Sequence, residues 1–216
     1  MVEEQDREPA RRIGKLIATM PFYPYNLGEG YNRIMDMLDT DDWAVLMDND
    51  VMLTTDSWYF QLMYAIENYP DADMFTAMTN RLAWKGQVVN PVEENLPHIG
   101  HTTYVSEGST EDILYHKQVG YDLLREYGGQ AFPINVTCGM FMCLSKRLWL
   151  DLGGFRNGLF EVDCNFMSKM KNAGKSLFVL PGLYVYHFHR KKMFGGRDVR
   201  DHWTYVIKDL RKRKRQ

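Results

Sequence analysis

The chain reads Trp43-Ala44-Val45-Leu46-Met47-Asp48-Asn49-Asp50, five apolar residues followed at once by two carboxylates one residue apart. A short apolar run that ends in polar residues is typical of a buried strand. Hard divalent cations prefer oxygen ligands, and one or two carboxylates often hold them against phosphate oxygens. We therefore predict that this strand delivers Asp48 and Asp50 to a metal; the plain alternative is a polar turn. An EF-hand is excluded, because Leu53 stands where that calcium loop needs glycine.

The segments around this stretch alternate between strand and helix patterns. Apolar runs predict strands, helical spacing of apolar residues predicts helices, and a loop rich in Pro, Asn and Gly follows the first strand. This order is typical of a parallel sheet with crossover helices, in which ligands bind beyond the carboxyl ends of the strands. The predicted elements are a strand at Ile13–Met20, the loop Pro21–Gly28, a helix at Gly30–Leu38, the strand Trp43–Met47, a helix at Ser57–Tyr69 with Phe60, Met63, Tyr64 and Ile66 inward, and a strand at Asp73–Ala77.

The rest of the chain is less regular at first and then regains its pattern. Residues 82–132 contain a long stretch of Gly, Pro, His and acidic residues before a helix at Ile113–Tyr127. A β-rich segment and two further helices come next, and Pro181-Gly182 separates two short strands. These elements are predicted at Pro133–Leu144 (β), Lys146–Leu152 and Asp163–Ala173 (helices), and Leu177–Leu180 and Leu183–His187 (strands).

Composition limits the classes of function. The chain has 216 residues, 45% of them hydrophobic, and a net charge of −2, which argues against a nucleic-acid partner. Three cysteines without a paired pattern predict a reducing compartment, so we expect a cytoplasmic protein. Residues 1–12 have no apolar core of a secretory signal, and no apolar run approaches the roughly 20 residues that a membrane span needs. The basic run Arg211–Arg215 is either a solvated terminus or a peripheral contact with anionic lipid.

Two further groups of residues carry possible chemistry. Glu161 and Asp163 stand where a helix begins, so each is either a cap of that helix or a general base for a hydroxyl. His187 and His189 alternate along a strand and lead into the basic residues 190–192. A neutral imidazole can complete a Mn²⁺ site, whereas an isolated histidine is more often structural.

Together these motifs resemble the GT-A fold of nucleotide-sugar glycosyltransferases, most closely glycosyltransferase family 2, over most of residues 13–192. Asp48-Asn49-Asp50 resembles the D-x-D motif of that family, and His187 with Arg190 resembles its metal-binding histidine. Asp163 lies eleven residues before Gly174, as the family's catalytic Asp does before a Gly, although Val162 replaces the preceding Glu. The other matching segments are Asn26-Leu27-Gly28 with Asn32, Cys138-Gly139-Met140, Ser145-Lys146-Arg147 and Gly153-Gly154-Phe155.

The resemblance implies one α/β catalytic domain over residues 1–216, with a Rossmann-like, mostly parallel sheet flanked by helices. Residues 13–81 would bind nucleotide and metal, residues 82–192 would bind the acceptor, and residues 193–216 would form a basic tail. The chain passes almost directly from Met20 to Asn26, so the nucleotide-binding half is shortened relative to the family.

The resemblance also implies the chemistry and the residues that perform it. A sugar would pass from a UDP- or GDP-linked donor to a hydroxyl of a glycan or of a lipid-linked or protein-linked acceptor, with inversion. Asp163 would be the base with Glu161 in support, and Mn²⁺ or Mg²⁺ would be held by Asp48, Asp50 and His187. Residues expected at the nucleotide sugar are Pro21, Asn26, Gly28, Asn32, Arg81, Asp48 and Arg190, and those expected near the acceptor are Trp84, His98, His101 and Trp203.

Two other functions remain open from the sequence. A nucleotidyltransferase also uses carboxylate-held Mg²⁺ on a related sheet, and it would release pyrophosphate instead of a nucleoside diphosphate. A sugar- or nucleotide-binding module without catalysis would bind the donor and transfer nothing.

Overall fold

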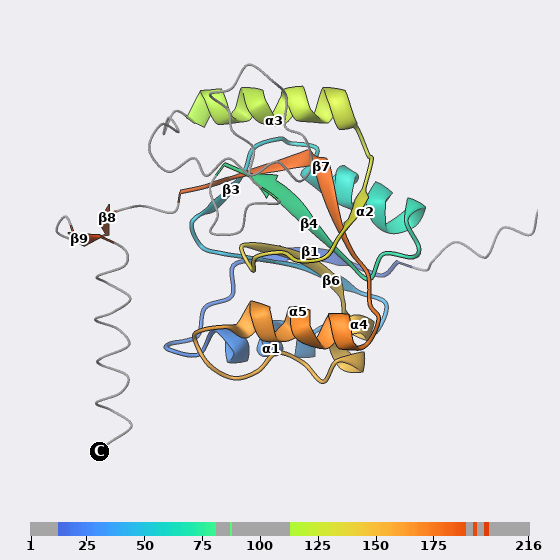
Figure 1. The fold of residues 1–216 in the computed structure, drawn as a ribbon, viewed down its shortest axis with the longest axis vertical. Helices are drawn as coiled ribbons and strands as arrows, with labels where there is room; N and C mark the ends of the chain where they lie inside the picture. Colours follow the sequence, from blue (N-terminus) through green and yellow to red (C-terminus); the bar gives the residue numbers. More distant parts are fainter. Residues whose placement is uncertain (1–12, 81–86, 88–112, 189–191, 194–196, 199–216) are drawn as a thin grey trace, which may run out of the picture.

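A computed structural model describes residues 13–80, 87, 113–188, 192–193 and 197–198. Its main feature is a seven-stranded sheet with helices on both faces (Figure 1). The strands run in the order β1-β2-β6-β4-β7-β3, and β5 pairs with β7. Their bounds are β1 Leu16–Thr19, β2 Trp43–Met47, β3 Val51–Leu53, β4 Met74–Thr79, β5 Phe132–Ile134, β6 Phe141–Ser145 and β7 Leu177–His187, and a separate ribbon pairs β8 Lys192–Met193 with β9 Arg197–Asp198.

The sheet is mixed, so the prediction of a mostly parallel sheet is wrong. β1 pairs with β2 and β4 with β7 in parallel, whereas β6 runs antiparallel between β2 and β4. β3 and β5 are also antiparallel to β7. The prediction assumed a crossover helix between successive strands, but no helix separates β2 from β3 or β5 from β6. Strands that are joined without a crossover helix are free to run antiparallel.

Five helices cover the two faces of the sheet among the residues described. In Figure 1, α1, α4 and α5 lie below the sheet, and α2 and α3 lie above it. Within these ranges, every helix is too short or too polar to span a membrane. The helix bounds are α1 Leu27–Asp36, α2 Trp58–Asn68, α3 Ile113–Tyr127, α4 Lys146–Asp151 and α5 Val162–Asn172.

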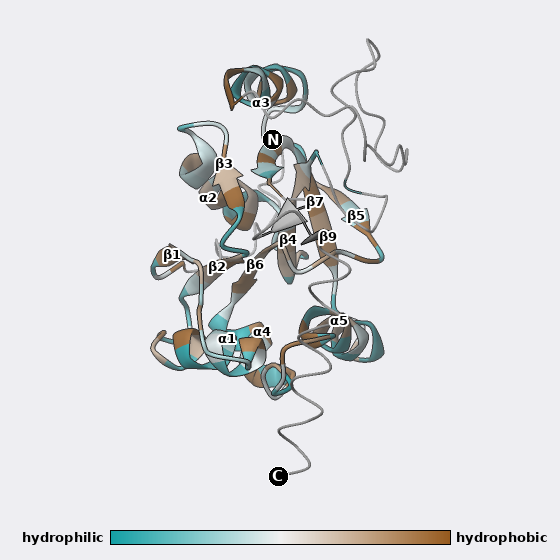
Figure 2. Ribbon diagram, turned by 90° about the vertical axis from the view of Figure 1, so that its left-hand side faces the viewer, coloured by the Kyte–Doolittle hydropathy of each residue, from teal (hydrophilic) through white to brown (hydrophobic). Residues whose placement is uncertain are grey.

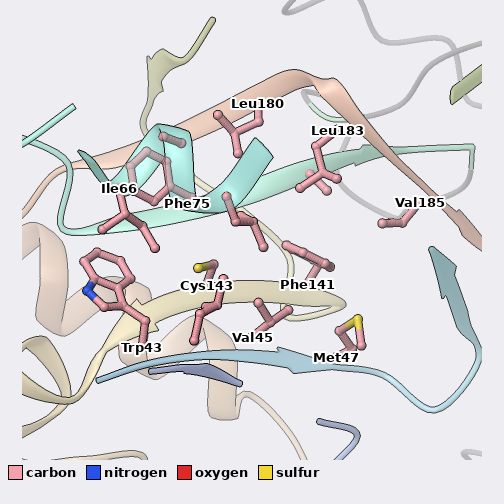
Figure 3. Close-up of a cluster of buried hydrophobic side chains, with 14 of the residues drawn as sticks. Trp43, Val45, Met47, Ile66, Phe75, Phe141, Cys143, Leu180, Leu183 and Val185 are labelled. Carbon is pink, nitrogen blue, oxygen red and sulfur yellow. The ribbon is translucent and has the colours of Figure 1, made fainter. Parts of the chain in front are cut away.

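The central strand β2 shows how the sequence builds both layers. It is buried on both faces, and its side chains alternate between two hydrophobic clusters. Trp43, Val45 and Met47 join the cluster under α2 (Figure 3), whereas Ala44 and Leu46 join the cluster under α1 and α5. In Figure 2 the strands between the helices are mostly brown, while α1 and α5 carry teal residues. The alternation directs the next even position, Asp48, toward the layer of α1 and α5.

Two predictions about packing are wrong in detail. The inward face of α2 carries Leu62, Ala65 and Ile66, while Phe60 is 73% exposed and Tyr64 is 51% exposed. Aromatic side chains were taken for core residues, but the helix turns its aliphatic stripe to the sheet instead.

The second error concerns the last strand. Pro181-Gly182 does not divide it, because β7 is continuous and the extra residues shift its register against β4 between Ala77 and Met78. A β-bulge of this kind absorbs a proline without ending the strand. A Cβ at Gly182 would collide with the carbonyl oxygen of Gly128, so the position requires glycine.

Candidate metal centre

The carboxylates follow β2 in a turn that crosses one edge of the sheet. Strand order places β6, β4 and β7 between β2 and β3, so residues 48–50 pass over the ends of those strands. Asp48 N–H donates to Met140 O at 3.0 Å, and Val51 N–H closes the turn on Asp48 O at 3.2 Å. Val51 then pairs with His187, which brings the end of β7 to the same place.

Three side chains converge at this turn. His187 Nε2 lies 3.2 Å from Asp50 Oδ1 and 4.0 Å from Asp48 Oδ2. One ligand atom from each of the three residues can be chosen so that all lie within 4.8 Å of one another. The imidazole is 6% exposed, whereas the two carboxylates are 38% and 40% exposed and open to one side. Such an arrangement offers a cation protein ligands on one side and leaves the other side for a substrate.

The donor set fits Mn²⁺ or Mg²⁺. Carboxylate oxygens suit both cations, and an imidazole nitrogen favours the transition metal. Burial raises the pKa of Asp48 to about 6; the His187 side chain opposes this, and the Asp50 and Asp163 carboxylates add to it. The centre therefore holds more negative charge than its surroundings stabilise, and a divalent cation would relieve that excess.

Asp163 lies on the same side of the sheet as Asp48. It occupies the first turn of α5, and its Oδ2 accepts a hydrogen bond from Gly139 N–H at 2.9 Å. A Cβ at Gly139 would lie 2.8 Å from Asp163 Cβ, so glycine permits the close approach. Gly139 directly precedes Met140, which is bonded to Asp48. The two residues directly before β6 thus link the predicted base to the D-x-D turn.

Two polar side chains beside the cluster extend the predicted set: Asn80, which directly precedes the predicted Arg81, and Tyr31. Asn80 follows β4, and its Oδ1 accepts the His187 backbone N–H at 2.8 Å. Its Nδ2 is fully enclosed and has no hydrogen-bond partner among the described residues. Tyr31, on α1, is 1% exposed, and it was read only as an apolar position of a helix. The available signals were a polar residue at a strand's carboxyl end and a phenol within an apolar stripe.

Three residues expected at the nucleotide lie where the start of α1 packs against the loop before α5. Asn26 caps α1 by accepting from Glu29 N–H at 3.1 Å, and it also accepts from Gly158 N–H at 2.7 Å. A Cβ at Gly28 would collide with the carbonyl oxygen of Arg156. Asn32 Oδ1 accepts from Trp149 Nε1 and from Phe155 N–H, both at 2.9 Å. These polar groups are engaged within the protein, and their role at a nucleotide stays a prediction.

The remaining predicted residues are further from the centre or outside the described ranges. Pro21 is half-buried in the loop after β1. The side chain of Glu161 is 73% exposed and forms an ion pair with Arg156 at 3.3 Å. It therefore points to solvent and Arg156, and not to the Gly139 contact of Asp163. The side chains of Arg81, Trp84, His98, His101, His189, Arg190 and Trp203 lie outside the described residues.

Comparison with known proteins gives a similarity to a solved structure. No family model matches the chain, and no curated protein matches it. A solved structure, the crystal structure of GalNAc-T7 with UDP, GalNAc and Mn²⁺, is similar with a TM-score of 0.48 and 11% sequence identity, over 76% of this chain and 30% of that chain.

Proposed function

We propose that the chain is a metal-dependent glycosyltransferase that moves a sugar from a nucleotide-diphosphate donor to an acceptor hydroxyl. One observation carries this proposal: two carboxylates and an imidazole converge at one edge of the sheet, and Asp163 lies on the same side, linked to them through Gly139. A cation-binding cluster next to a separate, fixed carboxylate supplies the two functions that the reaction needs. These are charge neutralisation on a leaving diphosphate and proton removal from a nucleophile.

Asp48, Asp50 and His187 would hold Mn²⁺ or Mg²⁺ in this proposal. When bound, the cation would neutralise the charge that develops on the departing diphosphate. His187 is the best anchored of the three ligands, because its N–H is bonded to Asn80 and its strand is paired with β3. The carboxylates are the open part of the cluster, so the donor would approach from their side.

Asp163 would act as the general base. The Gly139 N–H holds one of its oxygens and thereby orients the carboxylate. In a single displacement, the proton of the acceptor hydroxyl passes to Asp163 while the acceptor oxygen bonds to the anomeric carbon. The bond from that carbon to the diphosphate oxygen breaks, and the nucleoside diphosphate leaves. Attack from the face opposite the leaving group inverts the configuration at the anomeric carbon.

The finer assignments are also proposals. The donor would be linked to UDP or GDP, and Pro21, Asn26, Gly28, Asn32, Arg81 and Arg190 would lie on its side. The acceptor would be a glycan or a lipid-linked or protein-linked hydroxyl, and residues 82–192 would contribute to its site. All three cysteines are thiols rather than disulfides, which fits a cytoplasmic location. The basic residues 211–215 would give a peripheral contact with anionic lipid.

Identification of the released nucleotide tests the reaction class. The protein is incubated with UDP-sugars and GDP-sugars, with Mn²⁺ or with a chelator, and the products are separated. Metal-dependent release of a nucleoside diphosphate supports sugar transfer, either to an added acceptor or, as slow hydrolysis of the donor, to water. Release of pyrophosphate from a nucleoside triphosphate and a sugar phosphate would instead identify a nucleotidyltransferase. Donor binding without turnover, across a panel of glycan acceptors, would indicate a binding module.

A further inference from the structure

Tyr31 is a buried phenol that the core does not fully account for. It lies on α1, its ring centroid is 5.0 Å from that of Phe155, and it belongs to the cluster that also contains Leu46 and Phe166. The apolar ring is therefore well packed. Phenylalanine would fill the same space, so the hydroxyl requires a separate explanation.

The topology brings the Tyr31 end of α1 to the candidate metal centre. α1 connects the parallel strands β1 and β2, so it runs back against them and its first half lies near their carboxyl ends. α5 leads into β7, which is parallel to β4, so the first turn of α5 with Asp163 lies at the same edge. The alternation of β2 directs Asp48 to this face as well. Tyr31, Asp48 and Asp163 thus share one corner of the molecule.

The hydroxyl of Tyr31 has no hydrogen-bond partner within the described part of the chain. Three fully enclosed side-chain atoms of that part lack partners, namely Gln61 Oε1, Asn80 Nδ2 and Asn165 Oδ1, and the Tyr31 oxygen is not one of them. The 1% of Tyr31 that stays accessible therefore includes this oxygen. A buried donor without a protein partner, reachable from one side, is suited to a ligand.

The electrostatic surroundings keep this group a donor. Burial raises the pKa of the Tyr31 phenol well above its ordinary range, and the carboxylates of Asp48 and Asp163 raise it further. The hydroxyl stays protonated at every pH at which the protein would work. It can therefore donate a hydrogen bond to a neutral or anionic oxygen.

We infer that Tyr31 is a specificity-determining residue whose hydroxyl donates a hydrogen bond to a hydroxyl oxygen of the sugar being transferred; this inference rests on the proposed function. The diphosphate would sit at the Asp48 cluster and the acceptor at Asp163. The group that lies between them in a single displacement is the sugar ring. Tyr31 lies at the same corner of the molecule as both carboxylates, so it is placed to contact that ring.

Tyr31→Phe tests the inference, because it removes one oxygen and leaves the packing of the ring. Binding of UDP-glucose, UDP-N-acetylglucosamine and GDP-mannose, and of UDP and GDP alone, is measured by calorimetry with Mn²⁺ for the full chain and the variant. We expect the variant to bind the preferred nucleotide sugar about tenfold more weakly, the effect of one lost hydrogen bond, and to bind the matching diphosphate unchanged. Tyr64→Phe, on the outer face of α2, is the matched control and should change neither affinity.

Thermal unfolding of the same variants separates a contact from a structural role. Since the hydroxyl has no protein partner, Tyr31→Phe should unfold at the same temperature as the parent or a higher one. A clear drop in unfolding temperature would overturn the inference. Equal loss of affinity for the nucleotide sugar and the nucleoside diphosphate would overturn it too, and so would unchanged affinity for both. If the parent protein binds none of these nucleotides with Mn²⁺, the proposed function fails together with the inference. If the parent binds and only the Tyr31→Phe effect is missing, the inference alone fails.

Discussion

His187 Nε2 lies 3.2 Å from Asp50 Oδ1, although Asp50 lies in the turn before β3 and His187 ends β7, far away in the sequence. The pairing of β3 with β7 fixes this relationship, because Val51 faces His187 and Phe188 N–H donates to Asp50 O at 2.9 Å. The backbone therefore sets the position of the imidazole relative to the D-x-D turn. A preformed ligand set of this kind should bind a cation without first ordering the chain.

Asp50→Asn should abolish most of the affinity for Mn²⁺. The change keeps the size of the side chain and removes one charged ligand, so we expect at least about a 10- to 100-fold loss, the size of effect known for weaker perturbations of metal sites. Calorimetric titration with Mn²⁺ measures the affinity. Asp56→Asn, outside the cluster, is the control, and equal affinity of both variants would contradict the ligand assignment.

Metal binding should weaken in acid. Burial raises the pKa of Asp48 from its ordinary value of 3.8 to about 6, and the cation needs the ionised carboxylate. The affinity for Mn²⁺ should therefore be steady above about pH 7 and fall by up to about tenfold per pH unit below about pH 6.

For the metal-free protein, the same pKa shift makes the fold less stable as the pH rises. Because the folded state binds the proton more tightly than the unfolded state, the stabilisation from Asp48 is complete below about pH 4 and is lost as the pH rises through about 6. Asp48→Asn should remove this part of the pH dependence of unfolding. An unchanged profile in that variant would show that Asp48 does not titrate in this range.

Gly139→Ala should impair transfer while sparing metal binding. The added Cβ would lie 2.8 Å from Asp163 Cβ, so the carboxylate must move from its place. We expect a fall in turnover of about 100-fold, as for misplacement of a reacting group by about 1 Å, with the Mn²⁺ affinity unchanged. Gly30→Ala in α1 is the control, since its nearest neighbour would be 3.4 Å away and the helix should gain about 1 kcal/mol. Full turnover in Gly139→Ala would remove Asp163 from the mechanism.

Asn80→Ala should loosen the histidine ligand. The change removes the acceptor of the His187 backbone N–H and leaves that buried group unpaired, at a cost of about 1–3 kcal/mol in the free energy of unfolding. Denaturant titration measures this loss, and calorimetry should show weaker binding of Mn²⁺. Asn68→Ala removes an exposed side chain that donates to Tyr64 O, so it should cost much less. Similar losses in the two variants would mean that Asn80 does not support the site.

The five helices of the described residues and the strand β2 follow from the sequence because apolar spacing acts locally. α3 has the predicted bounds Ile113–Tyr127, whereas α1 begins at Leu27, inside the predicted loop Pro21–Gly28. The direction of β6 and the existence of β3 do not follow, since both depend on pairing between distant segments. β3 has only three residues, too few for a periodic pattern.

The same division applies to the candidate site. The positions of Asp48 and Asp50 at the end of a buried strand were predictable from the local run. Their approach to His187 depends on the pairing of β3 with β7, which no local pattern reveals. The hydrogen bond from Gly139 to Asp163 depends on the antiparallel placement of β6. The nearness of Tyr31 to the site depends on the face of β2 to which the Asp48 side chain points.

Thermal unfolding of the protein with a panel of nucleotide sugars, with and without Mn²⁺, directly tests whether the protein binds a nucleotide sugar through a metal ion. A ligand at 100 times its dissociation constant should stabilise the fold by about 2.7 kcal/mol. The proposal predicts such stabilisation by at least one nucleotide sugar, dependent on Mn²⁺ and lost in Asp50→Asn. No metal-dependent stabilisation by any nucleotide sugar would contradict it.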